Sequence, residues 1–561
     1  MRTPRLILTM SLLALPIVLA GQGPAPTTAP APSLDPKRLV QPLGEDWPTY
    51  SGDYTGKRFS PLTQVDRTSV KRLSLAWTAR LTAGTGAGGG GGRFRFGGGA
   101  PVIVGGNGPD NLPAVPANVK GTPLMVNGTL YVTTPDNTWA MDARDGRELW
   151  HYFWRTKGST PIANRGVGIW RDYLYFVTPD NFFVSLDAKT GKERWNKEHA
   201  DFDQQYFSTM APIVVDNHLL LGTGNDIDSP GYIQSFHPET GEVQWRFYTV
   251  PMKQGDPGLD TWPNLDMAQH GGGMTWQPIT YDPDTNTIYV TTGNPQPVVA
   301  YKNREGSNLY TASLVALDAD TGKMKWYFQA SPQDTHDWDA TQTPVLIDGT
   351  VAGKPRKLVA MAARNGHFFV LDRLTGKNIV SAEYVKTNWS KGYDEKGQPI
   401  PNPDKRPQVA GALVTPNQGG ATNWFSPSFS PQTGLFYVNA SRAFSVWYIY
   451  DASDNPMGWG GTDRGGYAEQ GQLKAIDYTT GKIRWSVPRY GGNSGLLSTA
   501  GNVVFGSGGN GLAAFNATTG QALWDSRIGN VTNGPITYEL DGRQYVVAGA
   551  GTRLAAFVLN P

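Results

Sequence analysis

An acidic segment in the middle of the chain, SPQDTHDWDATQ at residues 331–342, holds the side chains best suited to chemistry. It contains Asp334, Asp337 and Asp339 together with a His and a Trp. Asp337 and Asp339 alternate, so on an extended segment both side chains point the same way. Two converging carboxylates need a cation or a shared proton, and a hard cation such as Ca²⁺ takes about six to eight oxygen ligands. The segment predicts either a cation site with acid–base chemistry or an acidic turn without a ligand.

Five further motifs occur only once and could complete such a site. In HGGGMTW, residues 270–276, three glycines let the backbone approach a flat group, and Trp276 either faces a ligand ring or fills the core. In TTGNPQP, residues 291–297, Asn294 lies where a strand leaves its sheet, either as a binding residue or as an ordinary turn residue. The remaining motifs, ARNGHFFVLDR, GATNW and STPIANRGVG, contribute Arg364, Asn423 and Arg165, which singly are more typical of surface or turn positions.

Composition excludes several classes of function. The 49 basic and 47 acidic residues balance to a net charge of +2, which argues against nucleic acid or an anionic membrane as the main partner. Cysteine is absent, so the chain has no disulfide, thiolate metal site, cysteine nucleophile or cysteine-linked haem. The 7 histidines show no zinc-site spacing.

The elements that must position these residues are indicated by a repeat, Asp-x-x-Thr-Gly-x-x-x-Trp, in which each copy follows a short apolar strand pattern. The Asp side chain can hydrogen-bond its own turn, Gly supplies a backbone conformation that other residues resist, and Trp is large enough to wedge between neighbouring sheets. The copies read DARDGRELW (142–150), DAKTGKERW (187–195), HPETGEVQW (237–245), DADTGKMKW (318–326), DYTTGKIRW (477–485), NATTGQALW (516–524) and the degenerate DRLTGKNIV (372–380).

Counting these copies predicts the fold. Trp77 adds a seventh Trp-bearing unit, and the degenerate copy makes an eighth candidate blade. We therefore expect an all-β chain, an eight-bladed β-propeller with W-type docking motifs. The last strands, YVVAGAG and RLAAFVL, should complete a blade begun by the first ordered segment, which removes exposed sheet edges.

The domain organisation follows from composition along the chain. Residues 1–20 have a charged start and a short apolar run and read as a signal peptide, with an uncleaved anchor as the alternative. Residues 21–45 read as a Pro/Ala-rich flexible linker, and 46–561 as the propeller. No other apolar run is long enough to span a bilayer, so we expect a periplasmic or secreted protein. The long stretches between Trp245 and Trp326 and between Gly376 and Trp485 should form loops that cap one face.

Taken together and in order, these motifs resemble those of the pyrroloquinoline quinone (PQQ)-dependent alcohol dehydrogenases, the quinoprotein methanol and ethanol dehydrogenase family. The resemblance extends from WPTYSGDYTGKRFSPL at 47–62 to the last repeat. It implies an eight-bladed propeller that holds PQQ and a metal ion, Ca²⁺ or a lanthanide, near its axis. It also implies oxidation of a small alcohol.

The resemblance implies a role for each matching residue. Asp337 matches the catalytic aspartate, and Arg364 resembles the arginine that contacts the reactive quinone oxygens. Expected cofactor-binding residues are Trp276 under the PQQ rings, Arg165 and Thr209 at the cofactor carboxylates, and Asn423 as a further contact. Expected metal ligands are Asn294, Asp337, Asp226 at the position of a family glutamate, and Asp339, which resembles the additional acid that marks lanthanide-using members.

The sequence departs from the family pattern beside the expected cofactor. The adjacent-cysteine disulfide ring of the family falls on Ser159 and Thr160, and a family glutamate falls on Lys120. Asp226 has a shorter reach than the glutamate it replaces, and the second Trp expected near GGNSGLLSTAG is absent. The resulting prediction is an exported PQQ- and metal-dependent alcohol dehydrogenase that passes electrons to a separate carrier such as a cytochrome c. The alternative is a cofactor-free propeller that acts as a binding or scaffold module.

Overall fold

The protein is described here by a computed structural model that covers residues 34–86, 100–158, 163–340, 342–450, 453, 458–489 and 493–560. Strands make up nearly all of its regular structure, and the one α-helix of the described residues, α1 (Leu265–Gln269), has five residues. The all-β prediction is therefore confirmed. Within the described part of the chain, no helix is long and apolar enough to cross a membrane. Ser159, Thr160 and residues 1–33 lie outside the described residues.

Eight sheets of four or five strands make up the body of the described chain, each antiparallel apart from two added edge strands. The first four, each with its own strands, are β4 (Leu124–Val126), β5 (Thr129–Thr134), β6 (Asn137–Asp142), β7 (Glu148–Trp154) with edge strand β3 (Val102–Gly105); β8 (Gly168–Trp170), β9 (Tyr173–Val177), β10 (Phe182–Asp187), β11 (Glu193–Glu198); β12 (Ile213–Val215), β13 (His218–Thr223), β14 (Tyr232–Phe236), β15 (Val243–Tyr248); and β16 (Thr280–Asp282), β17 (Thr287–Thr291), β18 (Ser313–Asp318), β19 (Met324–Gln329).

The other four sheets continue in chain order and end with one that joins the two ends of the chain. They are β20 (Val345–Val351), β21 (Lys354–Ala362), β22 (His367–Asp372), β23 (Asn378–Glu383); β27 (Ser428–Ser430), β28 (Leu435–Ala440), β31 (Gln472–Asp477), β32 (Ile483–Pro488); β33 (Leu497–Thr499), β34 (Val503–Gly508), β35 (Gly511–Asn516), β36 (Ala522–Asp525) with edge strand β1 (Phe59–Ser60); and β37 (Ile536–Leu540), β38 (Arg543–Ala550), β39 (Arg553–Leu559), β2 (Leu73–Arg80).

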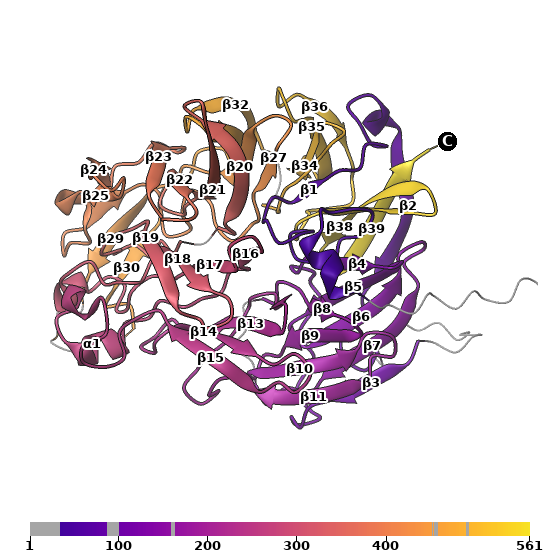
Figure 1. Ribbon diagram of the computed structural model, residues 1–561, viewed down its shortest axis with the longest axis horizontal. Helices are drawn as coiled ribbons and strands as arrows, with labels where there is room; N and C mark the ends of the chain where they lie inside the picture. Colours follow the sequence, from indigo (N-terminus) through magenta and orange to yellow (C-terminus); the bar gives the residue numbers. More distant parts are fainter. Residues whose placement is uncertain are drawn as a thin grey trace, which may run out of the picture.

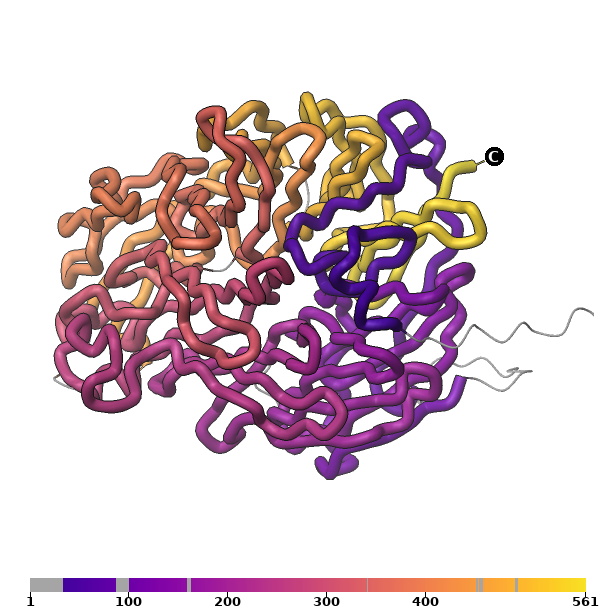
Figure 2. The backbone as a smooth tube through the Cα atoms, in the orientation of Figure 1, coloured from indigo at the N-terminus to yellow at the C-terminus, as the bar shows by residue number. Residues whose placement is uncertain are grey.

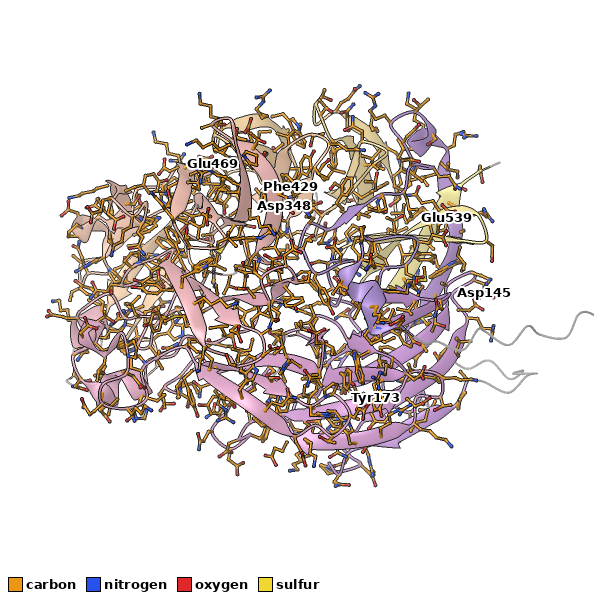
Figure 3. All side chains as sticks on the ribbon, viewed as in Figure 1. Asp145, Tyr173, Asp348, Phe429, Glu469 and Glu539 are labelled. Carbon is orange, nitrogen blue, oxygen red and sulfur yellow. The ribbon has the colours of Figure 1, made fainter. Side chains whose placement is uncertain are left out.

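The sheets follow one another around the molecule, from indigo through magenta and orange to yellow (Figures 1 and 2). The yellow end returns to the indigo beginning, where β39 pairs with β2 in antiparallel register from Leu73 opposite Leu559 to Arg80 opposite Arg553. The expected meeting of the two chain ends is therefore confirmed. Apolar side chains fill the space within and between the sheets, whereas exposed carboxylates such as Asp145 lie at the periphery (Figure 3).

The repeat builds the junction between successive sheets. In one copy, Oδ1 of Asp187 accepts hydrogen bonds from the backbone N–H and the hydroxyl of Thr190, at 2.9 and 2.8 Å. Gly191 follows with φ +70°, and a Cβ there would lie 2.7 Å from ring atoms of Trp150, which belongs to the preceding repeat. Trp150 Nε1 donates to the carbonyl of Ala188 at 3.1 Å. The glycine is needed both for its backbone conformation and for the space that it leaves to the indole.

The same contact recurs from sheet to sheet. Each repeat glycine faces the bulky side chain of the preceding unit, in the pairs Gly146–Trp77, Gly241–Trp195, Gly322–Trp245, Gly376–Trp326 and Gly520–Trp485. The degenerate copy has no Trp, and Val380 and Ala382 face Gly481 in its place. The next turn keeps its glycine, and these smaller side chains lie against it in the place of the indole.

An N-terminal hub segment, residues 47–60, touches the inner ends of most of the sheets. Hydrogen bonds link Trp47 to Met125, the Tyr54 hydroxyl to Val214, and Arg58 to Leu496 and Pro535. Further backbone hydrogen bonds join the segment to the sheets. They link the pairs Tyr54–Tyr281, Thr55–Leu346, Lys57–Phe429, Arg58–Ser498 and Ser60–Ala500. One short stretch thus ties together elements from most of the chain.

Packed structure also extends into the segment expected to be a linker. Leu34 is 1% exposed and forms a β-bridge with Arg171, and a 3₁₀ helix covers Pro36–Val40. Order therefore begins before Asp46, because Leu34 and Leu39 are buried against the first sheets.

The two stretches between β23 and β27 and between β28 and β31 together form an insertion with two small sheets of its own. These are β24 (Ser390–Tyr393) with β25 (Pro399–Pro401), and β26 (Ala412–Val414) with β29 (Ser445–Ile449) and β30 (Gly461–Arg464). Short 3₁₀ helices elsewhere cover Ser69–Arg72, Leu259–Thr261, Tyr301–Arg304 and Pro403–Lys405.

Candidate active site

A cavity of about 260 Å³ collects the predicted site residues. Its walls include ten of the twelve residues expected from sequence, namely Lys120, Arg165, Thr209, Asp226, Trp276, Asn294, Asp337, Asp339, Arg364 and Asn423. The other two, Ser159 and Thr160, lie outside the described residues.

The strand order explains why these distant residues meet. Some precede the first strand of a sheet, as Arg165 precedes β8 and Trp276 precedes β16. Others follow the second strand, as Asn294 follows β17 and Arg364 follows β21. In an antiparallel pair, the start of one strand and the end of the next lie at the same edge. The sheets that contribute to the cavity therefore present their site residues on the same face of the ring.

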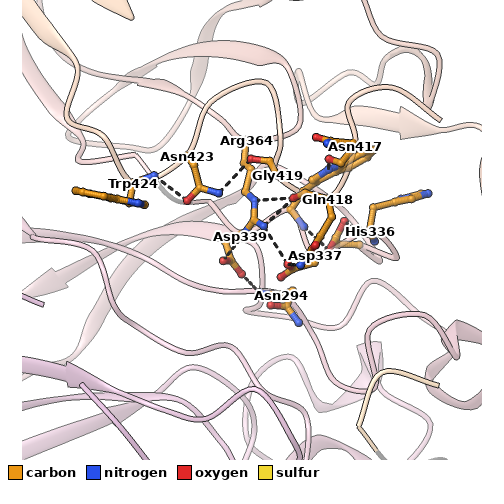
Figure 4. A network of polar contacts seen from close by, with 12 residues as sticks. Asn294, His336, Asp337, Asp339, Arg364, Asn417, Gln418, Gly419, Asn423 and Trp424 are labelled. Carbon is orange, nitrogen blue, oxygen red and sulfur yellow. Dashed lines mark hydrogen bonds and ion pairs between the residues drawn. The ribbon is translucent and has the colours of Figure 1, made fainter. Parts of the chain in front are cut away.

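Arg364 lies between the two central carboxylates of the site (Figure 4). Its Nη2 is 2.9 Å from Asp337 Oδ2, and its Nη1 is 2.9 Å from Asp339 Oδ2. Its Nε and Nη2 also donate to the backbone carbonyl of Gln418, at 3.1 and 2.7 Å. The guanidinium is buried, and the two carboxylates hold the Arg364 pKa above its usual value despite that burial.

Asp339 connects three other parts of the site. Its Oδ1 accepts the backbone N–H of Asn294 at 2.5 Å, and its Oδ2 accepts the indole N–H of Trp276 at 3.2 Å. Burial and repulsion from Asp337 raise the pKa of Asp339 well above its ordinary value. Asp339 thus fixes Trp276, Asn294 and Arg364 relative to one another.

Asp337 points one carboxylate oxygen away from its hydrogen-bonding neighbours. Arg364 Nη2 and Gln418 Nε2, the latter at 3.0 Å, both donate to Oδ2. Burial raises the pKa of Asp337, while Arg364 and Gln418 act against that rise. Asp337 and Asp339 both reach Arg364 and so face one side, as predicted, although φ is +61° at Asp337 and the segment is not a plain extended strand.

The intervening residues of the same segment pack on its other side. His336 stacks on Trp338 with ring centroids 4.4 Å apart, and Trp338 Nε1 donates to the carbonyl of Asn417 at 2.9 Å. Asp334 Oδ2 accepts the backbone N–H of Trp338 at 2.8 Å. These buried contacts turn the alternate residues, Asp337 and Asp339, toward the cavity.

Asp226 is a third carboxylate in the cavity wall. Its loop is held by Asn225, whose Oδ1 accepts the backbone N–H groups of residues 227–229. The Asp226 side chain keeps an exposed surface, yet desolvation by the surrounding protein, with repulsion from Asp337, raises its pKa to about 6. Among the described residues, no three acidic or histidine side chains converge into a metal cage. One guanidinium nevertheless faces three carboxylates, so the acidic end of the cavity lacks compensating positive charge.

The opposite part of the cavity presents a buried cation. The Arg165 guanidinium lies over the rings of Trp276 and Trp424, at 4.4 and 5.3 Å from their centroids. Nη1 donates to the hydroxyl and carbonyl of Thr209, whereas Nε is buried without a hydrogen bond. Burial lowers the pKa of Arg165 to about 10, and none of the ion pairs between described residues includes it. A flat anion would compensate this charge.

Several wall residues were not singled out from the sequence. Gln418 holds both Asp337 and Arg364, but it lies in a short loop, TPNQGG, whose role depends on distant contacts. Trp424 ends the GATNW motif, in which the sequence predicts a site role only for Asn423. Apolar wall residues contributed by separate loops are Phe207, Met274, Val298 and Trp459.

The chain matches known proteins over most of its length. A family model described as "Glucose/ethanol/alcohol dehydrogenase, beta-propeller domain" matches residues 47–409, and one described as "Outer membrane protein assembly factor BamB" matches 465–560. The quinohemoprotein alcohol dehydrogenase of Comamonas testosteroni is 37% identical over 90% of this chain and 72% of its own length. Its crystal structure superposes with a TM-score of 0.81 at 32% identity, over 94% of this chain and 82% of that one.

The names of two further relatives state an alcohol, together with a cytochrome c in one case and europium in the other. The 1-butanol dehydrogenase (cytochrome c) of Thauera butanivorans is 33% identical over 91% of this chain and 74% of its own length. A europium-containing methanol dehydrogenase has a TM-score of 0.76 at 28% identity, over 92% of this chain and 91% of that one.

Proposed function

Because the chain belongs to the PQQ-dependent alcohol dehydrogenase family, we propose that its central cavity binds PQQ and a metal ion and oxidises an alcohol. The chain is an oxidoreductase of this kind, and the eight sheets would be the blades of the family propeller. The single observation that carries the proposal is the joining, in one cavity, of a buried uncompensated cation and three carboxylates.

The cationic part of the cavity fits PQQ. The orphaned Nε of Arg165 needs an acceptor, which a cofactor carboxylate would supply. The indoles of Trp276 and Trp424, over which the Arg165 guanidinium now lies, would offer flat apolar faces to a fused ring system once that guanidinium turns to a cofactor carboxylate. Thr209, Asn423 and Lys120 line the same space and would add polar contacts.

The acidic part fits a hard cation. Asp226, Asp337 and Asn294 offer oxygen ligands, and Asp339 could join them if it exchanges a present hydrogen bond. A bound cation would offset the desolvation and the repulsion that now raise the pKa of Asp226 and Asp339. A third carboxylate favours a trivalent ion over Ca²⁺, and one structural relative is named as containing europium.

The residues can then divide the reaction between them. When bound, PQQ takes up the two electrons removed from the alcohol, and the metal acts as a Lewis acid. Asp337 would accept the alcohol proton on Oδ1, the oxygen turned away from Arg364 and Gln418. Arg364 would hold Asp337 in place and stabilise negative charge that develops beside it.

The electrons would leave to a separate acceptor such as a cytochrome c, as the name of the Thauera relative records for that protein. Export to a periplasm or the cell exterior, with residues 1–20 as signal and 46–561 as the propeller, remains part of the proposal.

Reconstitution tests this function. Purified protein with PQQ and either Ca²⁺ or La³⁺ should oxidise alcohols with a reducible dye. Asp337→Asn keeps the shape of the side chain and should lower kcat by about 10²–10⁴-fold, while PQQ still raises the melting temperature. An unchanged kcat in this variant would remove Asp337 from the chemistry. A wild-type protein with neither a quinone absorption band nor thermal stabilisation by PQQ would favour the cofactor-free binding module instead.

A further inference from the structure

One further buried arginine, Arg304, bonds to the segments that form the acidic wall without lining the cavity itself. It ends the short 3₁₀ helix Tyr301–Arg304, and its side chain is fully buried. Burial lowers its pKa to about 9. Among the described residues, the acceptors of its guanidinium are three backbone carbonyls and one amide oxygen, and none of them is a carboxylate. Burying a cation without a carboxylate partner costs free energy, and these hydrogen bonds offset that cost.

The three carbonyls belong to the two segments that carry Asn294 and Asp337. The guanidinium Nε donates to the Pro297 carbonyl at 2.7 Å, and Nη2 donates to the Val298 carbonyl at 2.6 Å. Nη2 also donates to the Asp334 carbonyl at 2.5 Å. Pro297 and Val298 follow Asn294 in one loop, and Asp334 precedes Asp337 in the acidic segment. One guanidinium thus joins the two segments.

The same two segments are joined a second time by a backbone hydrogen bond. The Ala340 N–H donates to the Thr292 carbonyl at 3.1 Å. On each segment, the expected metal ligand lies between this junction and the guanidinium. Residues 292–298 and 334–340 therefore form a closed frame around the two ligands, and Arg304 closes one of its ends.

The guanidinium end of the frame also orients the residues on both sides of Asp337. Asp334, whose carbonyl accepts from Arg304, turns its carboxylate back onto its own segment. Oδ1 accepts the backbone N–H of His336 at 3.3 Å, and Oδ2 accepts that of Trp338 at 2.8 Å. A short chain of hydrogen bonds thus leads from the buried guanidinium to the backbone beside Asp337.

A bound cation makes this end of the frame more important. In the structure, Asp339 Oδ1 accepts the Asn294 N–H at 2.5 Å and so helps to join the segments. If Asp339 turns to the metal, that hydrogen bond is given up, whereas the hydrogen bonds of Arg304 involve no expected metal ligand and can persist. A hard cation takes oxygen ligands at about 2.3–2.6 Å, so the segments must keep their separation for Asn294 and Asp337 to reach it together.

On the premise of the proposed function, we propose that Arg304 is a positioning residue that sets the separation of Asn294 and Asp337, and with it the affinity of the acidic wall for its metal ion. The guanidinium does so through the backbone, since its contacts reach neither of the two ligand side chains.

Arg58 supplies a matched control. It is as fully buried as Arg304, and it also donates to three backbone carbonyls. Those carbonyls belong to Tyr50, Leu496 and Pro535, none of which lines the cavity. Loss of the Arg58 contacts should therefore weaken the fold without acting on the metal ligands.

The test measures the binding of La³⁺ by isothermal titration calorimetry in the presence of PQQ. Arg304→Met keeps the length of the side chain but loses its donors, and Kd for La³⁺ should rise about 10–100-fold, the usual loss when a residue that orients a metal ligand is removed. Arg304→Lys keeps the charge without the forked geometry and should give a smaller rise. Arg58→Met should lower the melting temperature but leave Kd within about twofold of wild type.

Each outcome has a distinct meaning. An unchanged Kd in Arg304→Met, or an equal rise in Arg58→Met, would overturn the role of Arg304 while leaving the dehydrogenase function intact. Should Arg304→Met not fold, Arg304→Lys decides in its place, and a Kd equal to that of wild type would then overturn the inference. A wild-type protein that binds no La³⁺ and oxidises no alcohol after reconstitution would instead refute the proposed function on which the inference rests.

Discussion

Replacing Arg165 by Met should separate cofactor binding from stability. Arg165 and Arg58 are both buried arginines, and burial lowers the pKa of each to about 10. They differ in their partners. Arg58 donates to three carbonyls, those of Tyr50, Leu496 and Pro535. The guanidinium of Arg165 has an orphaned Nε and, among the described residues, donates only to Thr209. Arg58→Met is therefore the matched control.

The magnitudes follow from these contacts. At pH 7 both guanidinium groups are charged in folded and unfolded chains, so lowering the pKa from 12.5 to about 10 costs each about 3 kcal/mol of folding free energy. Arg165→Met recovers this cost and loses about 2–3 kcal/mol of cation–π and hydrogen-bond contacts. Its free energy of unfolding without cofactor should stay within about 1 kcal/mol of wild type. Arg58→Met recovers the same cost but leaves three buried carbonyls unpaired at about 2 kcal/mol each, so it should lose about 3 kcal/mol.

The assay is thermal and chemical denaturation with and without PQQ and metal. Loss of a buried charge pair with the cofactor should weaken PQQ binding by at least about 2 kcal/mol, or about thirtyfold in Kd. PQQ should therefore raise the melting temperature of Arg58→Met but not that of Arg165→Met at the same concentration. A PQQ-dependent shift in Arg165→Met equal to that of wild type would refute the assignment of Arg165 to the cofactor.

Two other predictions concern the sheet junctions and the acidic wall. Gly191→Ala should cost at least 2 kcal/mol more than Gly542→Ala in urea denaturation, roughly the strain of displacing a packed indole. Both glycines have left-handed φ values of +70° and +71°, but only at Gly191 would the Cβ meet Trp150; equal losses would contradict the packing role. Desolvation and repulsion from Asp337 raise the pKa of Asp226 from 3.8 to about 6, although the residue keeps an exposed surface, so its own contribution to the stability of the metal-free protein should fall slightly as pH rises through that interval. Asp226→Asn, melted in a chelator, should be more stable than wild type at pH 7 and equal to it near pH 4; a constant difference across that range would be the contrary result.

The repeat allowed much of the fold to be predicted, because its signals are local. Asp187, Gly191 and Trp150 each act within a turn or on the next sheet, so their spacing carries the information. The hub segment could not be predicted this way, since two partners of Arg58, Leu496 and Pro535, lie more than 400 residues away. Its Trp and Tyr residues have no periodic relation to the strands that they touch.

The site was predictable where motifs stand next to strand ends. Asn294, Arg364 and Trp276 lie next to strand ends, and with Asp337 they line one cavity. What could not be predicted is how they are paired, because the two ion pairs of Arg364 depend on the relative placement of different sheets. Gln418 and Trp459 escaped notice for a related reason. Both lie in the insertion, where no repeat gives the positions of side chains.

The hub segment has a consequence for how the protein folds and resists unfolding. Its contacts join residues separated by as many as 477 positions, including Arg58 with Pro535. Contacts so distant in sequence make loop closure slow, so the rate of folding should be set by the final seating of residues 47–60 among completed sheets. The same contacts must break before any one sheet can leave the ring. The native protein should therefore persist by a high kinetic barrier, and cleavage within residues 47–60 should shorten its lifetime far more than cleavage in an outer turn.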